Sequence, residues 1–66
     1  MKPYKLCVWT DGCWLTCGHY ATAGEAHNAM LDRLQRARAE GRELHVAVFD
    51  ADMTQIYRAM AVGDVE

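Results

Sequence analysis

The sequence predicts a small α+β fold of order ββαββ, in which one mainly antiparallel four-stranded sheet carries a single helix on one face. Three observations support this prediction. Apolar residues alternate with a period of two over residues 4–20, recur with a helical period over residues 23–40, and alternate again over residues 43–60. The length of 66 residues allows one small domain, residues 1–66, with one hydrophobic core.

The first predicted element is a hairpin over residues 4–20, built from strands at 4–10 and 13–20. Asp11-Gly12 separates the two apolar runs, and this dipeptide is typical of a two-residue type I′ turn because both central positions need a positive φ. The turn fixes which residues lie opposite each other across the hairpin. The expected pairs are Thr10 with Cys13, Trp9 with Trp14, Val8 with Leu15, Cys7 with Thr16, Leu6 with Cys17 and Tyr4 with His19.

A helix is predicted over residues 23–40. Thr22 is followed three residues later by Glu25, which is the pattern of a capping box, and Gly41 is a natural helix stop. Apolar and small residues recur along one face of this helix. The stripe contains Ala23, Ala26, His27, Met30, Leu34 and Ala37.

A second hairpin is predicted over residues 43–60, with strands at 43–49 and 54–60 around an Asp50-Ala51-Asp52-Met53 turn. Met53 stands where Gly or Asn is usual, so the turn type is left open. We expect Ile56 to pair with Val48. Residues 62–66 carry no periodic signal and are expected to fray. The order of the strands in the sheet does not follow from the sequence.

Strand alternation divides the side chains between two faces of the predicted sheet. The face toward Met30 and Leu34 of the helix is expected to be aliphatic. Its members are Leu6, Val8, Leu15, Cys17, Leu44, Val46, Val48 and Ile56. The opposite face has no helix to cover it and is expected to carry Trp9, Trp14, Phe49, Tyr57, Cys7, Thr16, Gln55 and His45.

Aromatic residues on an uncovered sheet face have two interpretations. Cross-strand aromatic pairs stabilise hairpins by roughly 0.2–1 kcal/mol each, so the rings could serve the fold alone. Exposed aromatic patches also mark contact sites, because Trp and Tyr supply a large contact area at low entropic cost. Base stacking is not expected, since the chain lacks the βαββαβ order of RNA-recognition modules. A protein interface would have Trp9, Trp14, Phe49 and Tyr57 at its centre and Lys5, His45, Gln55 and Arg58 near its rim.

Cysteine and histidine residues form the second candidate site. Strand alternation would point Cys13, Cys17 and His19 toward the helix, where His27 points back, and such a set can bind zinc. Cys13 and Cys17 would lie about 13 Å apart along an extended strand, which is too far for a common metal. A site of Cys17, His19 and His27 is the alternative, but no metal or other cofactor is expected. No catalytic residue is expected either, because a fold this small has little room for a deep pocket.

Composition and charge limit the classes of partner and the cellular compartment that we expect. The net charge of −2 gives no global attraction to nucleic acid or anionic lipid, and no apolar run is long enough to cross a membrane. The segment with Lys2, Pro3 and Lys5 lacks the apolar stretch of a secretory signal, and three cysteines are an odd number for a disulfide framework. We therefore expect reduced thiols and a cytoplasmic protein.

The expected function is that of a non-enzymatic protein-binding module, acting by surface occlusion or adaptor contact through the aromatic face. The small core also favours a homodimer. By analogy of size alone, phage-encoded inhibitors of host machinery such as anti-CRISPR proteins are the kind of protein we expect. The alternative is a small zinc- or thiol-dependent regulatory protein that uses Cys17, His19 and His27.

Overall fold

The computed structural model describes residues 2–61, and these residues form four strands and one helix in the predicted order. The elements are β1 (Tyr4–Thr10), β2 (Cys13–Tyr20), α1 (Ala23–Ala39), β3 (Leu44–Phe49) and β4 (Gln55–Ala61). All three strand pairs are antiparallel, and the strand order is β2-β1-β3-β4. The predicted fold class is confirmed, with element ends within one residue of those expected. The frayed tail predicted at 62–66 lies outside the described residues.

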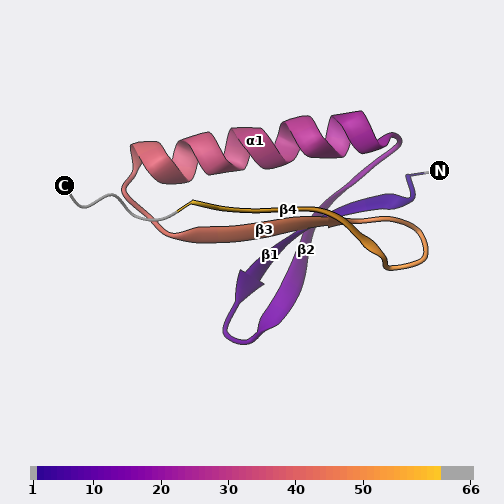
Figure 1. Cartoon of the computed structure of the whole chain (residues 1–66), viewed down its shortest axis with the longest axis horizontal. Helices are drawn as coiled ribbons and strands as arrows, with labels where there is room; N and C mark the ends of the chain where they lie inside the picture. The colour runs from indigo at the N-terminus through magenta and orange to yellow at the C-terminus, as the bar shows by residue number, and fades with distance from the viewer. Residues whose placement is uncertain (1, 62–66) are drawn as a thin grey trace.

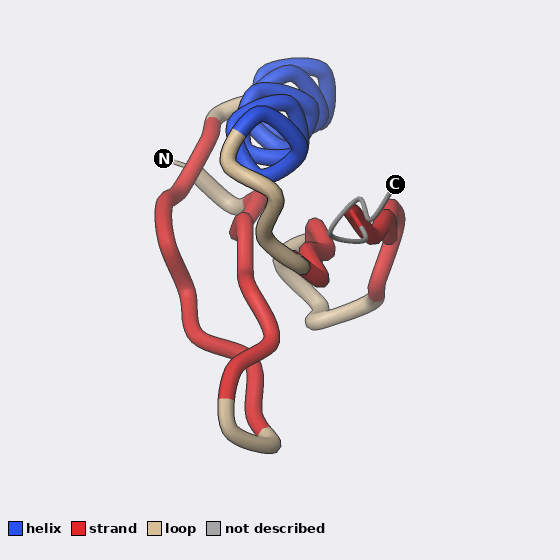
Figure 2. Tube along the Cα trace, turned by 90° about the vertical axis from the view of Figure 1, so that its left-hand side faces the viewer, coloured by secondary structure: helices blue, strands red, loops and turns tan. Residues whose placement is uncertain are grey.

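Helix α1 runs along one face of the sheet, above β3 and β4, and the β1–β2 hairpin extends beyond it (Figure 1). Seen from the end, the turn between β1 and β2 lies far below the helix (Figure 2). The core between the two layers is small and aliphatic. Its buried members are Leu6, Ala26, Met30, Leu34, Ala37, Val46, Val48 and Ala61. The predicted helix stripe therefore supplies half of the core, and its small alanine side chains let α1 lie close to the sheet.

Both ends of α1 are capped as the sequence indicates. The Thr22 hydroxyl accepts from the backbone N–H of Glu25 at 3.1 Å, and Glu25 Oε1 accepts from the N–H of Ala21 at 3.3 Å. At the other end Gly41 has a φ of 69°. The N–H of Arg42 donates to the carbonyl of Ala37 at 2.8 Å, which closes a Schellman motif. The caps fix the helix between the two hairpins.

The two hairpin turns use different solutions to reverse the chain. Asp11 and Gly12 have φ values of 51° and 87°, which is the type I′ geometry that their sequence predicts. In the β3–β4 turn, Asp50 Oδ1 accepts from the N–H groups of Asp52 and Thr54 at 2.9 and 3.0 Å. Met53 then takes a φ of 63°, a left-handed conformation that is unfavourable for its side chain.

A β-bulge in β2 shifts the pairing of β1 with β2, so part of the predicted register is wrong. The pairs from Thr10 with Cys13 to Cys7 with Thr16 are as expected, but the next pairs are Leu6 with Gly18 and Tyr4 with Tyr20. The predicted pairs of Leu6 with Cys17 and of Tyr4 with His19 are therefore wrong. Cys17 is the extra residue of the bulge, and the insertion moves every following side chain to the other face.

Gly18 makes room for an aromatic ring after this bulge. A Cβ atom at Gly18 would lie 3.0 Å from the Tyr20 hydroxyl oxygen, so the tyrosine ring folds back over the glycine. Tyr4 and Tyr20 both pack against the core from this end of the sheet. The bulge thus brings Tyr20 to the helix face opposite Tyr4, and Cys17, which was predicted there, is exposed.

A second bulge, in β4, shifts the pairing of β3 with β4 relative to the predicted register. Tyr57, and not Ile56, pairs with Val48, because Ile56 is the extra residue between the Val48 and Phe49 pairs. Tyr57 therefore lies on the helix face, where its ring centroid is 4.6 Å from that of His27 on α1. The predicted core position of Ile56 and the predicted open-face position of Tyr57 are both wrong.

Leu15 was also expected in the core but is 51% exposed. It shares the helix-side face with Val8, its partner in β1. Leu15 lies close to the turn between β1 and β2. This end of the hairpin lies far from α1 in the end-on view (Figure 2). The length of the hairpin beyond the helix, which alternation alone does not reveal, accounts for this error.

We predict that Met53→Gly raises the free energy of unfolding by about 0.5 kcal/mol, because relief of the left-handed strain outweighs the added entropy of the unfolded chain. The matched change Ala51→Gly, in the same turn but without a positive φ, should lower it by about 0.5 kcal/mol. Urea unfolding of both variants checks the opposite signs. A loss of stability in Met53→Gly equal to that in Ala51→Gly would contradict the argument.

Candidate functional site

The sheet surface opposite α1, which we call the open face, is the candidate site. The strand registers place on it Lys5, Cys7, Trp9, Trp14, Thr16, His19, His45, Ala47, Phe49, Gln55, Arg58 and Met60. Seven of the eight predicted interface residues are in this set. Tyr57 is the exception, because the bulge in β4 places it on the helix face.

Three aromatic rings form a continuous chain across the open face. The ring centroids of Trp9 and Trp14 are 5.2 Å apart with planes at 72°, so the predicted cross-strand pair is edge to face. Trp14 and Phe49 follow at 5.7 Å and 74°. Such edge-to-face contacts are worth about 0.5–1.5 kcal/mol beyond the area they bury. Because β1 lies between β2 and β3, the contact of Trp14 with Phe49 passes over the central strand β1.

A thin apolar layer lies beneath these rings. Cys7 is 3% exposed and Ala47 is fully buried, although both lie on the face that α1 does not cover. They are cross-strand partners in β1 and β3, and Cys7 Sγ lies 3.6 Å from the Thr16 hydroxyl oxygen. Trp14 and Phe49, both half-buried, span the strand that carries Cys7. For these two rings this placement favours the interpretation that cross-strand aromatic contacts stabilise the sheet.

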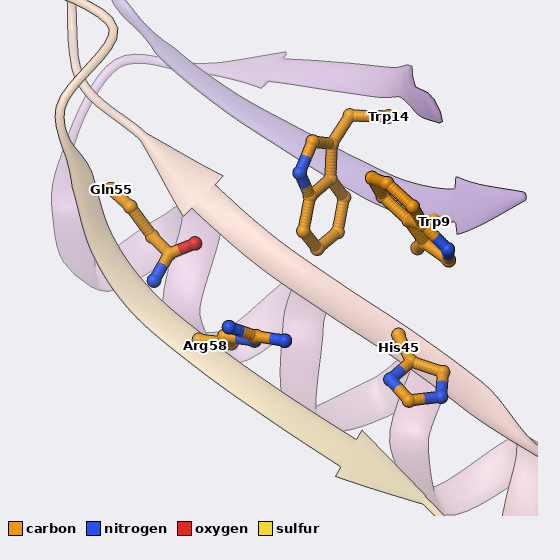
Figure 3. A pocket seen from close by; sticks show the side chains of 5 residues that line it. All are labelled: Trp9, Trp14, His45, Gln55 and Arg58. Carbon is orange, nitrogen blue, oxygen red and sulfur yellow. The ribbon is translucent and has the colours of Figure 1, made fainter. Parts of the chain in front are cut away.

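Trp9 differs from the other two rings because it is 45% exposed. With Trp14 it forms one wall of a hollow of about 440 Å³ whose other lining residues are His45, Gln55 and Arg58. The two indoles extend from the hairpin toward β3, and the three polar side chains come from β3 and β4 (Figure 3). The hollow has the volume of a typical ligand site but is open to solvent on one side. This is more space than the sequence led us to expect.

The open face is basic, although the chain as a whole is acidic. The four strands contain no aspartate or glutamate, and their basic residues, Lys5, His19, His45 and Arg58, all lie on this face. Glu43 and Asp50, the acidic residues nearest to β3 in the sequence, lie outside the strands. The Asp50 carboxylate is also occupied by the N–H groups of its own turn. The positive field at the hollow is therefore not cancelled by a carboxylate on the sheet.

The structure separates the three residues of the predicted alternative zinc site. Cys17 lies in the bulge, and its thiol contacts the carbonyl of Leu15 at 3.8 Å. His19 pairs with Lys5 on the open face, whereas His27 lies against Tyr57 on the helix side. Among residues 2–61, no group of three or more Cys, His, Asp or Glu side chains is placed to hold a metal ion. The bulge is the physical reason, because it leaves Cys17 unpaired and exposed and moves His19 to the open face.

Two parts of the open face were not found from the sequence. The buried layer of Cys7 and Ala47 depends on β1 and β3 being neighbours, and the strand order was not predictable. Met60, which is 53% exposed beside His45, was assigned to no face. Strand alternation could have placed it, because Met60 follows Arg58 by two residues in β4 and therefore shares its face.

Comparison with protein-family models, with curated proteins and with solved structures gave no match. Within the described part of the chain, α1 is too short and too polar to cross a membrane.

We predict that thiol-specific reagents distinguish Cys7 from the other two cysteines. Cys13 and Cys17 are exposed and should react with Ellman's reagent at once, whereas Cys7 should react only as the sheet opens. The measurement is the time course of thiol release, with Cys17→Ser as a control that removes one rapid equivalent. Three equivalents released at a single rate would show that Cys7 is not covered.

A second prediction separates the structural ring from the exposed one. Trp14→Ala should lower the free energy of unfolding by about 2 kcal/mol, because it uncovers the apolar layer, and Trp9→Ala by less than about 1 kcal/mol. Urea unfolding followed by circular dichroism measures both, with Leu15→Ala as an exposed control. An equal loss in the two tryptophan variants would mean that Trp9 is also part of the core.

Proposed function

We propose that the protein is a non-enzymatic protein-binding module that docks a partner through the open face, with Trp9 as the central contact. The observation that carries the proposal is the position of Trp9. Trp9 is nearly half exposed at the edge of a hollow. The contact of Trp14 with Phe49, which spans the strand that carries Cys7, does not involve Trp9. Tryptophan and arginine are the residues most enriched among those that dominate protein interfaces, and Arg58 lies across the hollow from the indoles.

The surroundings of Trp9 fit an interface better than an active site. A protein interface has an apolar centre with a polar rim, and here two indoles are bordered by His45, Gln55 and Arg58. Covalent or acid–base catalysis would need a nucleophile or base with an orienting partner, and neither histidine of the open face has a neighbouring carboxylate on the strands. We therefore propose binding and no catalysis.

We also propose how the protein acts on its partner and in which compartment it is located. A rigid sheet face without a catalytic group acts by covering a surface of its partner, so we propose occlusion or adaptor contact, as phage-encoded inhibitors of host machinery achieve. A cytoplasmic location is supported by the three free thiols, two of them exposed, because such thiols persist in a reducing compartment. Homodimer formation stays a prediction.

The proposal predicts that a partner is lost when Trp9 alone is changed. Wild-type protein, Trp9→Ser and Leu15→Ser would be immobilised and exposed to extract of the native host, and the retained proteins quantified by mass spectrometry. Leu15 is a matched control because it is as exposed as Trp9 but lies on the helix-side face of the hairpin.

We expect the partner to be retained by wild type and Leu15→Ser, and to bind Trp9→Ser at least tenfold more weakly when purified, or about 1.4 kcal/mol. Circular dichroism of each variant confirms that the fold is intact. Equal retention by wild type and Trp9→Ser would refute docking through the open face.

A further inference from the structure

We propose that the partner segment seated on the open face is acidic, with a carboxylate held by Arg58 and an apolar side chain placed against Trp9. The proposal rests on the protein-binding function above and names the chemistry of the partner. Three features of the open face support it: the sign of its charge, the kind of hydrogen-bonding groups that line the hollow, and the angles between its rings.

Acidic charge is segregated away from the open face. Lys5 and Arg58 are permanent cations on the open face, and the four strands carry no acidic residue, yet the chain has a net charge of −2. The acidic residues are therefore confined to the helix, the turns and the chain ends. Electrostatic complementarity favours partners of opposite sign and rejects like charge. An anionic segment is the occupant that this distribution selects.

Hydrogen-bond donors predominate around the hollow. Arg58 offers five N–H groups that can grip a carboxylate with two parallel bonds, and each indole of Trp9 and Trp14 is a donor only. Within residues 2–61 these three side chains have no protein hydrogen-bond partner. Water can satisfy these donors in the free protein, so an occupant that displaces this water has to be rich in acceptors, such as a carboxylate flanked by backbone carbonyls.

The rings favour an acidic protein segment over a single strand of nucleic acid. Base stacking is favoured by rings whose faces form a common platform, but the planes of Trp9 and Trp14, and of Trp14 and Phe49, meet at 72° and 74° in edge-to-face contacts, so the three rings form no such platform. Two cations would also give a salt slope of only about −1.4 for a single strand, so the electrostatic contribution to such binding would be small. One or two carboxylates need no larger field.

A second copy of the chain is a poor occupant of this face. In a symmetric dimer the same surface meets itself, so each open face would meet a face that carries Lys5 and Arg58 and whose strands have no carboxylate. Like charges brought together across an interface are unfavourable. The open face is thus better suited to a different, acidic surface.

The proposal can be tested with a random library of short linear peptides selected on immobilised wild-type protein. We expect the selected peptides to be enriched in aspartate and glutamate over the starting library. The best of them should bind Arg58→Glu at least about tenfold more weakly than wild type and retain most of their affinity for Arg58→Lys. Arg33→Glu makes the same change in net charge on the exposed side of α1, so its affinity should stay within about twofold of wild type.

Several results would overturn the proposal. In the peptide selection, these results are the recovery of neutral or basic peptides, the recovery of no peptide, or undiminished binding of the selected peptides to Arg58→Glu. Tighter binding of an oligothymidylate than of the selected peptides would point to nucleic acid. A wild-type dimer that Trp9→Ser dissociates would show that a second copy occupies the open face. Failure of this proposal is distinguishable from failure of the proposed function. A native partner lost by Trp9→Ser but bound normally by Arg58→Glu keeps the protein-binding function and excludes the acidic partner, whereas retention by both variants excludes both.

Discussion

The fold of this protein depends on how one short helix covers a four-stranded sheet. Helix α1 reaches only one face, and on that face it buries the aliphatic side chains of β1, β3 and β4. A two-layer domain of this size has nothing further to place on the second face. The sheet closes that face with its own side chains, and the chain of Trp9, Trp14 and Phe49 over Cys7 and Ala47 is the result. The candidate site is therefore a consequence of the same constraint that shapes the core.

This origin explains why the aromatic residues divide between two roles. Trp14 crosses β1 to reach Phe49 and contributes to burial, so its position is set by the need for stability. Trp9 lies at the outer end of the chain of rings, where the hairpin has passed beyond the helix, and is anchored on one side only. A side chain held in place by an edge-to-face contact but open to solvent is preorganised for binding, because little conformational entropy remains to be lost.

The sequence was sufficient for those features that local chemistry determines. The Asp11-Gly12 turn, the Thr22 and Gly41 caps and the helix stripe each depend on a few neighbouring residues, and all were found as expected. Face assignments failed beyond Cys17 and at Ile56, because one extra residue in a strand reverses the alternation after it and leaves no mark on composition. The hollow and the charge segregation require the order β2-β1-β3-β4, which only tertiary packing decides.

Both bulges occur in the outer strands, β2 and β4, and neither central strand carries one of the extra residues. An outer strand has a free side that can absorb an inserted residue without disturbing a second ladder of hydrogen bonds. Gain or loss of a single codon at positions 17 or 56 would therefore exchange the inward and outward side chains of half a strand while the backbone scaffold persists. Insertions and deletions at these two places would therefore change the side-chain composition of the open face while the order of the strands stays the same.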